Sequence, residues 1–315
     1  MNYAILFPGQ GSQTVGMGAD VFAKHQDILG DTADSLLGWS LRSMCLDGPL
    51  EELTRTEYAQ PALFAVSYAL WVSFREMVGV SPAAAAGHSL GEYTALAAAG
   101  AMNFSEGLRL VAERGKHMAR AAGIERSGMA ALIGADEQLA ERIVEERKAG
   151  GGKLQLANLN APGQVVVAGS EADLDWLEAN GKNLGVRRVI PLKVAGAFHS
   201  SFMQPAAEQL SAVIDEVRFD TPDFEVISNV SAVPHERDSI AAKLVEQVTS
   251  TVQFERSLRA AADSGINTFV HIGPGDVTAG LAKRTIPEAK VFTVSSLDDI
   301  DSAVESLSTI VGSES

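Results

Sequence analysis

The sequence has little of what several common architectures need, beginning with cysteine. Its one cysteine, Cys45, excludes an internal disulfide and is compatible with a reducing cytoplasm. We expect Cys45 to pack in the core, because nothing in Ser43-Met44-Cys45-Leu46 would activate a thiol. No apolar run approaches the ~20 residues that cross a bilayer, and no basic leader precedes the apolar stretch 3–7. The chain is therefore expected to be cytoplasmic and to make no contact with membranes.

Metal-binding patterns and basic charge are also scarce. The six histidines show no His-x-x-x-His spacing, and no Cys-x-x-Cys pair is possible, so we expect no metal site. The chain has 25 lysines and arginines against 40 aspartates and glutamates, a formal net charge of −15. This excess of acid argues against nucleic acid and anionic membrane surfaces as partners. Solubility is a sufficient reason for it.

What the chain does contain fits an α/β protein. A length of 315 residues can bury a sizeable core, as one large domain or as a domain with an insert. Strand-like runs alternate with helical ones, the pattern of a parallel sheet covered by helices. The strands expected for this sheet are 4–7, 225–229, 268–272 and 290–294, and residues 61–77 are expected to be helical.

Between about residues 124 and 193 the chain changes to shorter units. Their order is strand, helix, strand, strand, helix, strand, which is the ferredoxin-like arrangement. The expected elements are 129–133, 136–148, 154–158, 164–168, 171–180 and 186–192. We therefore predict that residues 124–193 form a small domain inserted into a large one made of 1–123 and 194–315. Gly123 and Gly196 suit the hinges.

Ser89 occupies a sequence pattern that is typical of catalytic serines. Gly87-His88-Ser89-Leu90-Gly91 matches Gly-x-Ser-x-Gly, a strand-to-helix turn that exposes a nucleophilic hydroxyl. The helix expected from 90 to about 99 would direct its first amides toward Ser89 and favour negative charge there. The alanines at 83–86 are poor strand formers, so close packing of small residues is the alternative interpretation.

A nucleophilic serine needs a neighbouring base, and His199 is the best candidate. Ser201 and Gln204 form a capping-box pattern, which predicts a helix from there to about residue 217. The positive end of that helix would disfavour imidazolium and keep the His199 ring neutral, as a base requires. The alternative is a loop histidine whose ring is satisfied by the backbone.

The other histidines are weaker candidates for the base. His88 adjoins the serine, where neighbouring side chains diverge, so we expect it to have a structural role. His25, His117 and His235 stand in polar contexts and are expected to be exposed. His271, at the end of an apolar strand, remains a minor candidate.

Arg114 is singled out by helical periodicity. In the helix expected over 104–122, one stripe contains Gly107, Val111, Arg114 and Met118, whereas the other charged residues lie elsewhere. Arg114 is therefore predicted to be buried, which is costly for a guanidinium unless it is paired. An internal carboxylate could pair with it. The alternative is a substrate carboxylate, which the planar fork of donors would bind at two points.

Six motifs, in order along almost the whole chain, resemble those of the malonyl-CoA:acyl-carrier-protein transacylases. They are FPGQGSQ at 7–13, GHSLGE at 87–92, AERGKHM at 112–118, NLNAPGQ at 158–164, GAFHS at 196–200 and GPG at 273–275. The resemblance implies a large α/β-hydrolase-like domain with an inserted ferredoxin-like small domain. It also implies that Ser89 is the nucleophile, His199 the base and Arg114 the clamp for the free carboxylate of malonate.

Further site residues follow from the resemblance alone. The backbone N–H groups of Gln10 and Leu90 would form the oxyanion hole. The backbone carbonyl of Gln247 would hold the second nitrogen of the histidine, which explains why no third-member aspartate stands out. Asn160 would line the cleft between the domains.

The resemblance has two departures. Many bacterial members have Pro-Ser-His where this chain has Ala197-Phe198-His199, a form similar to malonyl-selective polyketide acyltransferase modules. Phe198 would crowd an α-methyl branch and favour malonyl over methylmalonyl by ~1–3 kcal/mol. His271 stands where an acidic residue is common before Gly-Pro-Gly, and the sequence gives no physical reason for that change.

The activity implied is transfer of malonyl from malonyl-CoA to the phosphopantetheine thiol of acyl carrier protein, through a serine acyl-enzyme, for fatty acid synthesis. Malonyl-CoA is a substrate, no cofactor is expected, and a monomer suffices. The alternatives are an acyltransferase for polyketide synthesis or malonate decarboxylase, and a serine thioesterase or esterase. Because such carriers are usually acidic, docking requires a local basic patch. Candidate pairs are Lys116 with Arg120, Arg187 with Arg188, and Lys283 with Arg284.

Overall fold

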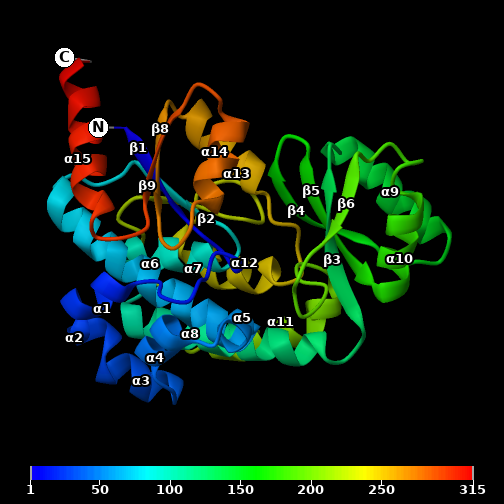
Figure 1. The fold of residues 1–315 in the computed structure, drawn as a ribbon, viewed down its shortest axis with the longest axis horizontal. Coiled ribbons are helices and arrows are strands. Elements are labelled where there is room, and N and C mark those ends of the chain that lie inside the picture. Colours follow the sequence, from blue (N-terminus) through cyan, green and yellow to red (C-terminus); the bar gives the residue numbers. More distant parts are fainter. Residues whose placement is uncertain (1, 314–315) are drawn as a thin grey trace.

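The computed structural model describes residues 2–313 and contains two sheets that lie side by side (Figure 1). The first sheet is parallel, with strand order β7-β2-β1-β8-β9. Its strands are β1 (Tyr3–Phe7), β2 (Ala84–Gly87), β7 (Glu225–Ile227), β8 (Thr268–Ile272) and β9 (Lys290–Val294). The four strands predicted for this sheet are confirmed, and residues 84–87 add a strand that alanine-rich composition disfavours.

Helices cover both faces of the parallel sheet, so its central strands are buried on both sides. Side chains of β1 alternate between two cores: Ile5 packs with one group of helices and Leu6 with another. The first group includes α6 (Thr56–Val78), α7 (Leu90–Ala98), α8 (Phe104–Ala122) and α15 (Asp299–Ser313). The second comprises α13 (Phe254–Asp263) and α14 (Val277–Thr285). The helix predicted over 61–77 thus begins earlier, with Pro61 inside it.

Short helices connect β1 to α6, and others lie beside the site described below. The first set is α1 (Ala19–Lys24), α2 (Gln26–Leu29), α3 (Asp31–Leu37), α4 (Leu41–Asp47) and α5 (Leu50–Thr54). The second set is η1 (Ser201–Met203), α11 (Gln204–Ile214), η2 (Arg237–Ser239) and α12 (Ile240–Gln247). Cys45, on α4, is fully buried, and burial raises the pKa of its thiol to about 12. Its predicted place in the core is confirmed.

The second sheet is antiparallel and is built entirely from residues 127–191. Its strand order is β4-β5-β3-β6, and the strands are β3 (Ser127–Ile133), β4 (Gln155–Ala161), β5 (Gln164–Ser170) and β6 (Arg188–Pro191). Helices α9 (Glu137–Ala149) and α10 (Glu171–Asn180) cover the face turned away from the parallel sheet (Figure 1). The order β3-α9-β4-β5-α10-β6 follows the predicted order of elements, although β6 is shorter than the expected 186–192.

The inner face of the antiparallel sheet continues the main core. Met129 and Val166 belong to the same buried cluster as the helices around α6 and α8. Backbone hydrogen bonds also join the two parts: Leu159 N–H donates to Val252 O at 2.9 Å, and Val252 N–H donates to Ala157 O at 2.9 Å. Within residues 2–313, none of the helices is both long and apolar enough to span a bilayer. The fold is thus a mixed α/β arrangement with a seam between its two sheets.

Candidate active site

Ser89 lies in the turn between β2 and α7, with a left-handed backbone conformation, φ 53°. Two side chains hold this turn: Ser89 N–H donates to Asn229 Oδ1 at 2.7 Å, and Gln247 Nε2 donates to Ser89 O at 2.8 Å. A Cβ at Gly87 would collide with the carbonyl group of Gly91. The glycines are therefore required for the close approach of helix to strand, and the strained serine is held from both sides.

His199 lies beside the serine hydroxyl. Its Nε2 is 2.8 Å from Ser89 Oγ, and its Nδ1 is 2.8 Å from the backbone carbonyl of Gln247. A carbonyl oxygen only accepts, so Nδ1 carries the proton and Nε2 is free to accept the hydroxyl proton. Burial, with a further contribution from the nearby Arg114, lowers the pKa of His199 to about 3. The ring is neutral at pH 7, the state that a general base needs.

The local structure around His199 differs from the expected capping box, which is wrong. Ser200, not Ser201, caps the turn η1: its side chain accepts from Phe202 N–H. Helix α11 begins at Gln204 and ends at Ile214, short of residue 217. His199 itself has φ 57°, so this histidine, like Ser89, has an unfavourable backbone conformation.

Arg114 is 1 % exposed and reaches the serine. Its Nη2 donates to Ser89 Oγ at 3.0 Å and to Gln247 Oε1 at 2.7 Å, and its Nη1 donates to Gln60 Oε1 at 2.7 Å. The guanidinium also lies 5.3 Å from the ring centre of Tyr93. Across residues 2–313, no carboxylate forms an ion pair with Arg114, so the internal-carboxylate alternative is wrong. Burial lowers the pKa of the guanidinium.

A cavity of about 190 Å³ opens onto these groups. Among the residues that line it are Ser89, His199, Arg114, Gln10, Asn160 and Phe198. Leu90 is the first residue of α7, and the first N–H groups of a helix have no partner within the helix. Six of the eight sequence-predicted site residues therefore line one cavity, whose wall comes from both the parallel and the antiparallel parts of the fold. Of the other two, Gln247 contacts His199 and Leu90 directly follows Ser89.

His88 points to the other side of the turn. Its Nε2 donates to Asn160 Oδ1 at 2.8 Å, and its ring packs 5.3 Å from that of Phe254. Burial lowers the pKa of this imidazole. The side chains of His88 and Ser89 diverge, as expected, and the His88–Asn160 hydrogen bond joins the serine turn to β4.

None of the three histidines expected to be exposed is exposed, since only 11% of the His117 side chain is accessible and the other two rings are buried. His25 is buried with Nε2 2.6 Å from Ser73 Oγ, and His235 is buried with Nε2 2.6 Å from Glu92 Oε1. Polar neighbours in sequence misled the prediction, because both rings turn inward onto a polar partner. His271 is also buried, between Thr278 Oγ1 at 2.6 Å and Gly273 O at 3.0 Å. It ties the Gly-Pro-Gly turn to the start of α14, which gives this position a structural reason.

Several buried polar residues at the site escaped the sequence reasoning. They are Gln60, which accepts from Arg114, Asn229, which accepts from Ser89 N–H, and Glu92, which accepts from Gln247. His235, expected to be exposed, donates to Glu92. The sequence does contain a signal for Glu92, because it is a single carboxylate in the first turn of the apolar helix α7. Such a carboxylate is costly to bury without hydrogen-bond donors, so its position indicates polar partners nearby. Asn229 has no such signal, since it lies 140 residues from the serine that it holds.

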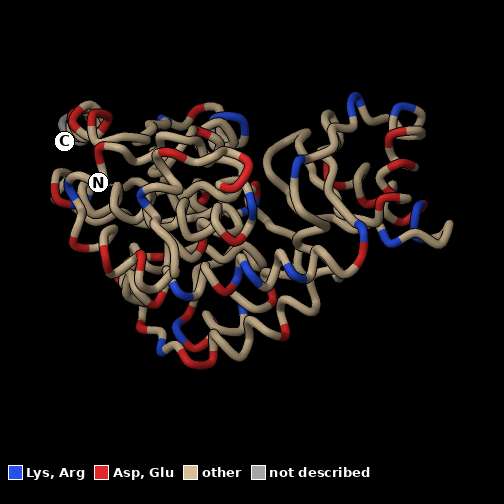
Figure 2. Tube along the Cα trace, turned by 60° about the horizontal axis from the view of Figure 1, so that its bottom comes forward, with Lys and Arg blue, Asp and Glu red and all other residues tan. Residues whose placement is uncertain are grey.

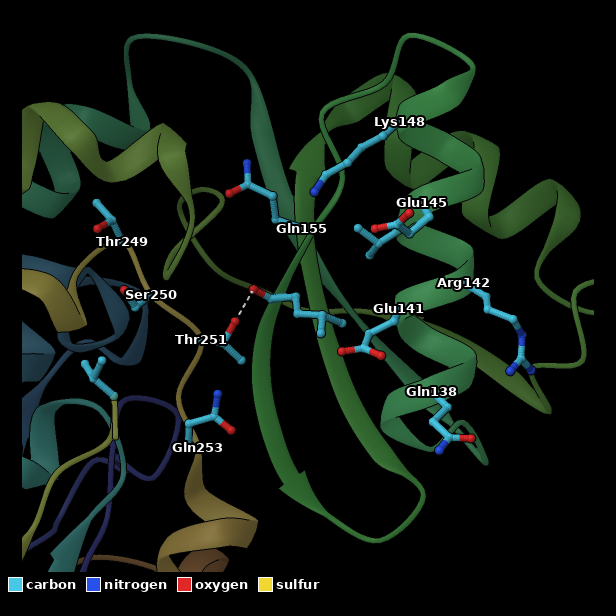
Figure 3. A pocket seen from close by; sticks show the side chains of 13 residues that line it. Gln138, Glu141, Arg142, Glu145, Lys148, Gln155, Thr249, Ser250, Thr251 and Gln253 are labelled. Carbon is cyan, nitrogen blue, oxygen red and sulfur yellow. Dashed lines mark hydrogen bonds between the residues drawn. The ribbon is translucent and has the colours of Figure 1, made fainter. Parts of the chain in front are cut away.

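A larger groove lies away from this cavity. Its volume is about 1110 Å³, and it runs between α9 and the segment 249–253 (Figure 3). The side chains that line it are mostly polar and of both charges, including Glu141, Arg142 and Lys148. Ser89, His199 and Arg114 do not line it, so size alone does not identify the reactive site in this fold.

Comparisons of the sequence and the fold with known proteins identify a family. The family model described as acyl transferase domain matches residues 5–304, which defines the class of protein. The chain is 42% identical, over 96% of each chain, to the malonyl CoA-acyl carrier protein transacylase of Bacillus subtilis (strain 168). The structure of the malonyl CoA-acyl carrier protein transacylase from Coxiella burnetii matches with a TM-score of 0.92 and 34% identity, covering 97% of each chain.

A third relative is a malonyl-transacylase solved in complex with its type II PKS acyl-carrier protein. It matches with a TM-score of 0.92 and 35% identity, over 97% of this chain and 100% of that one. The chain belongs to the malonyl CoA-acyl carrier protein transacylase family.

Proposed function

We propose that the protein transfers a malonyl group from malonyl-CoA to the phosphopantetheine thiol of an acyl carrier protein, through an acyl-enzyme on Ser89. The observation that carries this proposal is the hydrogen-bonded chain from Ser89 through His199 to Gln247, with the Arg114 guanidinium in the same cavity. The names of the relatives give the acyl group and the acceptor. Fatty acid synthesis is the process that we propose it supplies.

In the first half-reaction, Ser89 Oγ attacks the thioester carbonyl while His199 Nε2 takes the hydroxyl proton. The hydrogen bond from Nδ1 to Gln247 O holds the ring in the orientation and tautomer that this needs. The negative charge that develops on the carbonyl oxygen is stabilised by the backbone N–H groups of Gln10 and Leu90. The C–S bond then breaks, and the coenzyme A thiolate takes the proton from His199.

The second half-reaction runs the same steps in reverse. The carrier thiol gives its proton to His199 and attacks the malonyl-serine ester. The bond between the acyl carbon and Oγ breaks, and Oγ recovers its proton. Exclusion of bulk water from the cavity favours the thiol over hydrolysis, and the burial of Ser89 and His199, at 9% and 4% exposure, is in keeping with this.

Arg114 selects the malonyl group in this proposal. The guanidinium Nε has no hydrogen-bond partner among the described residues, and Nη1 uses one of its two protons on Gln60 Oε1, whereas both Nη2 protons are directed to Ser89 Oγ and Gln247 Oε1. Donor capacity therefore remains for a carboxylate, which an uncharged acetyl group cannot use. Phe198, in the wall of the same cavity, would disfavour a methyl branch and so select malonyl over methylmalonyl.

Two of the three candidate basic pairs lie together, which favours them for carrier docking. Arg284 Nε donates to Pro162 O at 2.6 Å, and Gly134 N–H donates to the adjacent Gly163 O at 2.9 Å. Beside Gly134, Arg188 begins β6 opposite Ile133, and the preceding Arg187 donates its N–H to Ile133 O at 3.1 Å. These arginines are exposed, whereas Lys116 is engaged by Glu113 at 2.8 Å. Helix α14 also supplies Val277 and Leu281 to the cavity wall, so this patch adjoins the cavity.

The large part, 1–123 and 194–315, is proposed to be α/β-hydrolase-like, and the insert at 124–193 to be ferredoxin-like. The enzyme is proposed to act as a cytoplasmic monomer without a cofactor, metal ion or nucleic acid.

The test is to incubate the protein with malonyl-CoA labelled in the acyl group. We expect stable label on Ser89 that is released when carrier protein bearing phosphopantetheine is added, and no label on S89A. Rapid appearance of free malonate would instead identify a thioesterase. A protein that takes up no label and releases no malonate would be a binding subunit without catalysis.

A further inference from the structure

A buried carboxylate lies next to the site without touching the cavity. Glu92 Oε1 accepts from Asn229 N–H at 3.1 Å and from His235 Nε2 at 2.6 Å, and Oε2 accepts from Gln247 Nε2 at 2.6 Å. The side chains of Glu92 and His235 are both fully buried. We call these four residues the Glu92 network. A carboxylate in such surroundings is stable only with good donors on both oxygens, and here each oxygen has at least one.

The Gln247 amide links this carboxylate to Arg114. Its Nε2 donates to Glu92, and its Oε1 accepts from Arg114 Nη2 at 2.7 Å. If the amide were turned over, its oxygen would face a carboxylate and its NH₂ a guanidinium, so both contacts would be repulsive. The Glu92 carboxylate therefore dictates which end of the amide meets Arg114.

We propose that Glu92 is a positioning residue for Arg114, a counter-charge held one amide away from the guanidinium. A carboxylate in direct contact would neutralise the buried arginine but would also occupy the donors that the malonyl carboxylate needs. Without any internal carboxylate, the guanidinium would be buried with no compensating charge. Placing Glu92 behind Gln247 meets both requirements. This inference rests on the proposed function, since it concerns how the clamp for malonyl is kept ready.

His235 fixes the carboxylate within the Glu92 network. Its Nδ1 has no hydrogen-bond partner among the described residues. An imidazolium would leave a buried N–H unsatisfied there, whereas a neutral ring with its proton on Nε2 leaves only a weak acceptor. The geometry thus fits a neutral donor, which orients Glu92 and leaves its charge to balance that of Arg114.

The decisive experiment is a double-mutant cycle between E92Q and R114A. The measured quantity is kcat/KM for labelling of Ser89 by malonyl-CoA and, separately, by acetyl-CoA, which has no carboxylate for Arg114 to bind. We expect E92Q to lower the malonyl value by about tenfold or more and the acetyl value by less than about threefold. In the R114A background, E92Q should change the malonyl value by less than about threefold, because the residue through which it acts is gone.

Additive effects in the cycle, or an equal fall for both acyl groups, would overturn the role of Glu92. The matched control is E246Q, which removes an exposed carboxylate from the same helix as Gln247 and should leave both values unchanged. If the wild type takes no malonyl label at all, the proposed function fails instead. A labelled wild type with an additive cycle defeats only the inference about Glu92.

If E92Q fails to fold, a second pair of variants tests the positioning role of Glu92. H235L removes the donor to Glu92, and H235Q keeps an N–H donor on a side chain of similar reach. We expect H235L to lower the malonyl-to-acetyl ratio by about threefold or more and H235Q to preserve it. Equal ratios for H235L and the wild type, with both proteins folded by circular dichroism, would contradict the proposal.

Discussion

Gln247 contacts both the proposed base, His199, and the proposed clamp, Arg114. Its backbone carbonyl accepts from His199 Nδ1, and its side chain joins Arg114 to Glu92 and to the carbonyl of Ser89. The family resemblance predicts the first contact but not the other three. Motif matching assigns a role to one atom of a residue, whereas burial forces every polar atom of Gln247 to find a partner.

The clamp predicts a change of acyl preference in R114A. We expect kcat/KM for malonyl-CoA to fall by about 10- to 150-fold, because a charged hydrogen bond contributes ~1.5–3 kcal/mol. Acetyl transfer should not fall with it, since acetyl makes no use of the guanidinium. Competition between labelled malonyl-CoA and acetyl-CoA measures the ratio directly. A variant that rejects acetyl as strongly as the wild type would show that Arg114 is not the clamp.

The environment of His199 predicts the pH dependence of acylation. Protonation of Nε2 removes the base, so the rate falls as pH falls through the pKa of the folded protein. Because burial and Arg114 lower that pKa from 6.5 to about 3, the acid limb should lie well below pH 6.5. The measurement is the rate of Ser89 labelling by acetyl-CoA between pH 4 and pH 8, with circular dichroism confirming the fold at each pH.

R114A provides the internal check on this profile. It removes the charge that helps to lower the pKa, so the acid limb should move toward higher pH while burial still keeps it below 6.5. An acid limb near pH 6.5 in the wild type, or one that R114A shifts downward, would contradict the assignment.

Among the elements, those with a clear period or a turn signal could be predicted from the sequence. The strands at 268–272 and 290–294 and the helix at 104–122 match their expected bounds. β2 was doubtful because alanine is a poor strand former, yet it pairs with β1 and β7 in the middle of a sheet. Tertiary pairing outweighs local propensity there, and small side chains let α7 lie close against the strand.

Contacts between elements distant in the chain could not be predicted from residue patterns. The periodicity of α8 correctly predicts that Arg114 is buried. Its hydrogen-bond partners Gln60 and Gln247, however, lie 54 and 133 residues away in the sequence. The capping-box prediction failed for a related reason. Either Ser200 or Ser201 could cap the turn that leads into Gln204. Ser200 does so, and its buried hydroxyl is also held by a hydrogen bond to Ala197 O, a contact that the sequence pattern does not show.

The junction of β2 and α7 predicts the cost of enlarging its glycine. G87A places a methyl group onto the Gly91 carbonyl, which cannot move without displacing the helix, so we expect a loss of ~3 kcal/mol or more of stability. The control is G280A on α14, where an added Cβ meets nothing within 4 Å and alanine should stabilise by ~1 kcal/mol. Urea unfolding of both variants gives the comparison. A G87A protein as stable as G280A would mean that the close approach is wrong.

At the scale of the whole molecule, acidic positions are spread over both parts of the fold, with basic ones between them (Figure 2). A net charge of −15 therefore repels an acidic carrier on average, and association depends on local charge. The arginines at the edge of the antiparallel sheet and at the end of α14 form one such locality beside the cavity.

Charge reversal tests this surface. R187E and R284E should each raise the KM for carrier protein several-fold, about 0.5–1 kcal/mol per rim contact, and the effect should weaken as salt is added. The kcat and the rate of labelling by malonyl-CoA alone should stay unchanged, because neither residue lines the cavity. K116E with R120E is the comparison pair. A larger effect there, on α8, would place the carrier on the other side of the molecule.

The division of the cavity wall between two sheets has an evolutionary consequence. The hydroxyl, the imidazole and the guanidinium all come from outside residues 124–193, whereas Met129, Asn160, Val166 and Leu192 close the cavity from within that segment. Exchange of the segment between homologues would therefore reshape one wall of the cavity while Ser89, His199 and Arg114 stay in place. Arg114 and Phe198 also lie outside the segment, so a chimaera of this kind should keep the selection that they exert and change only the room left for the rest of the acyl group.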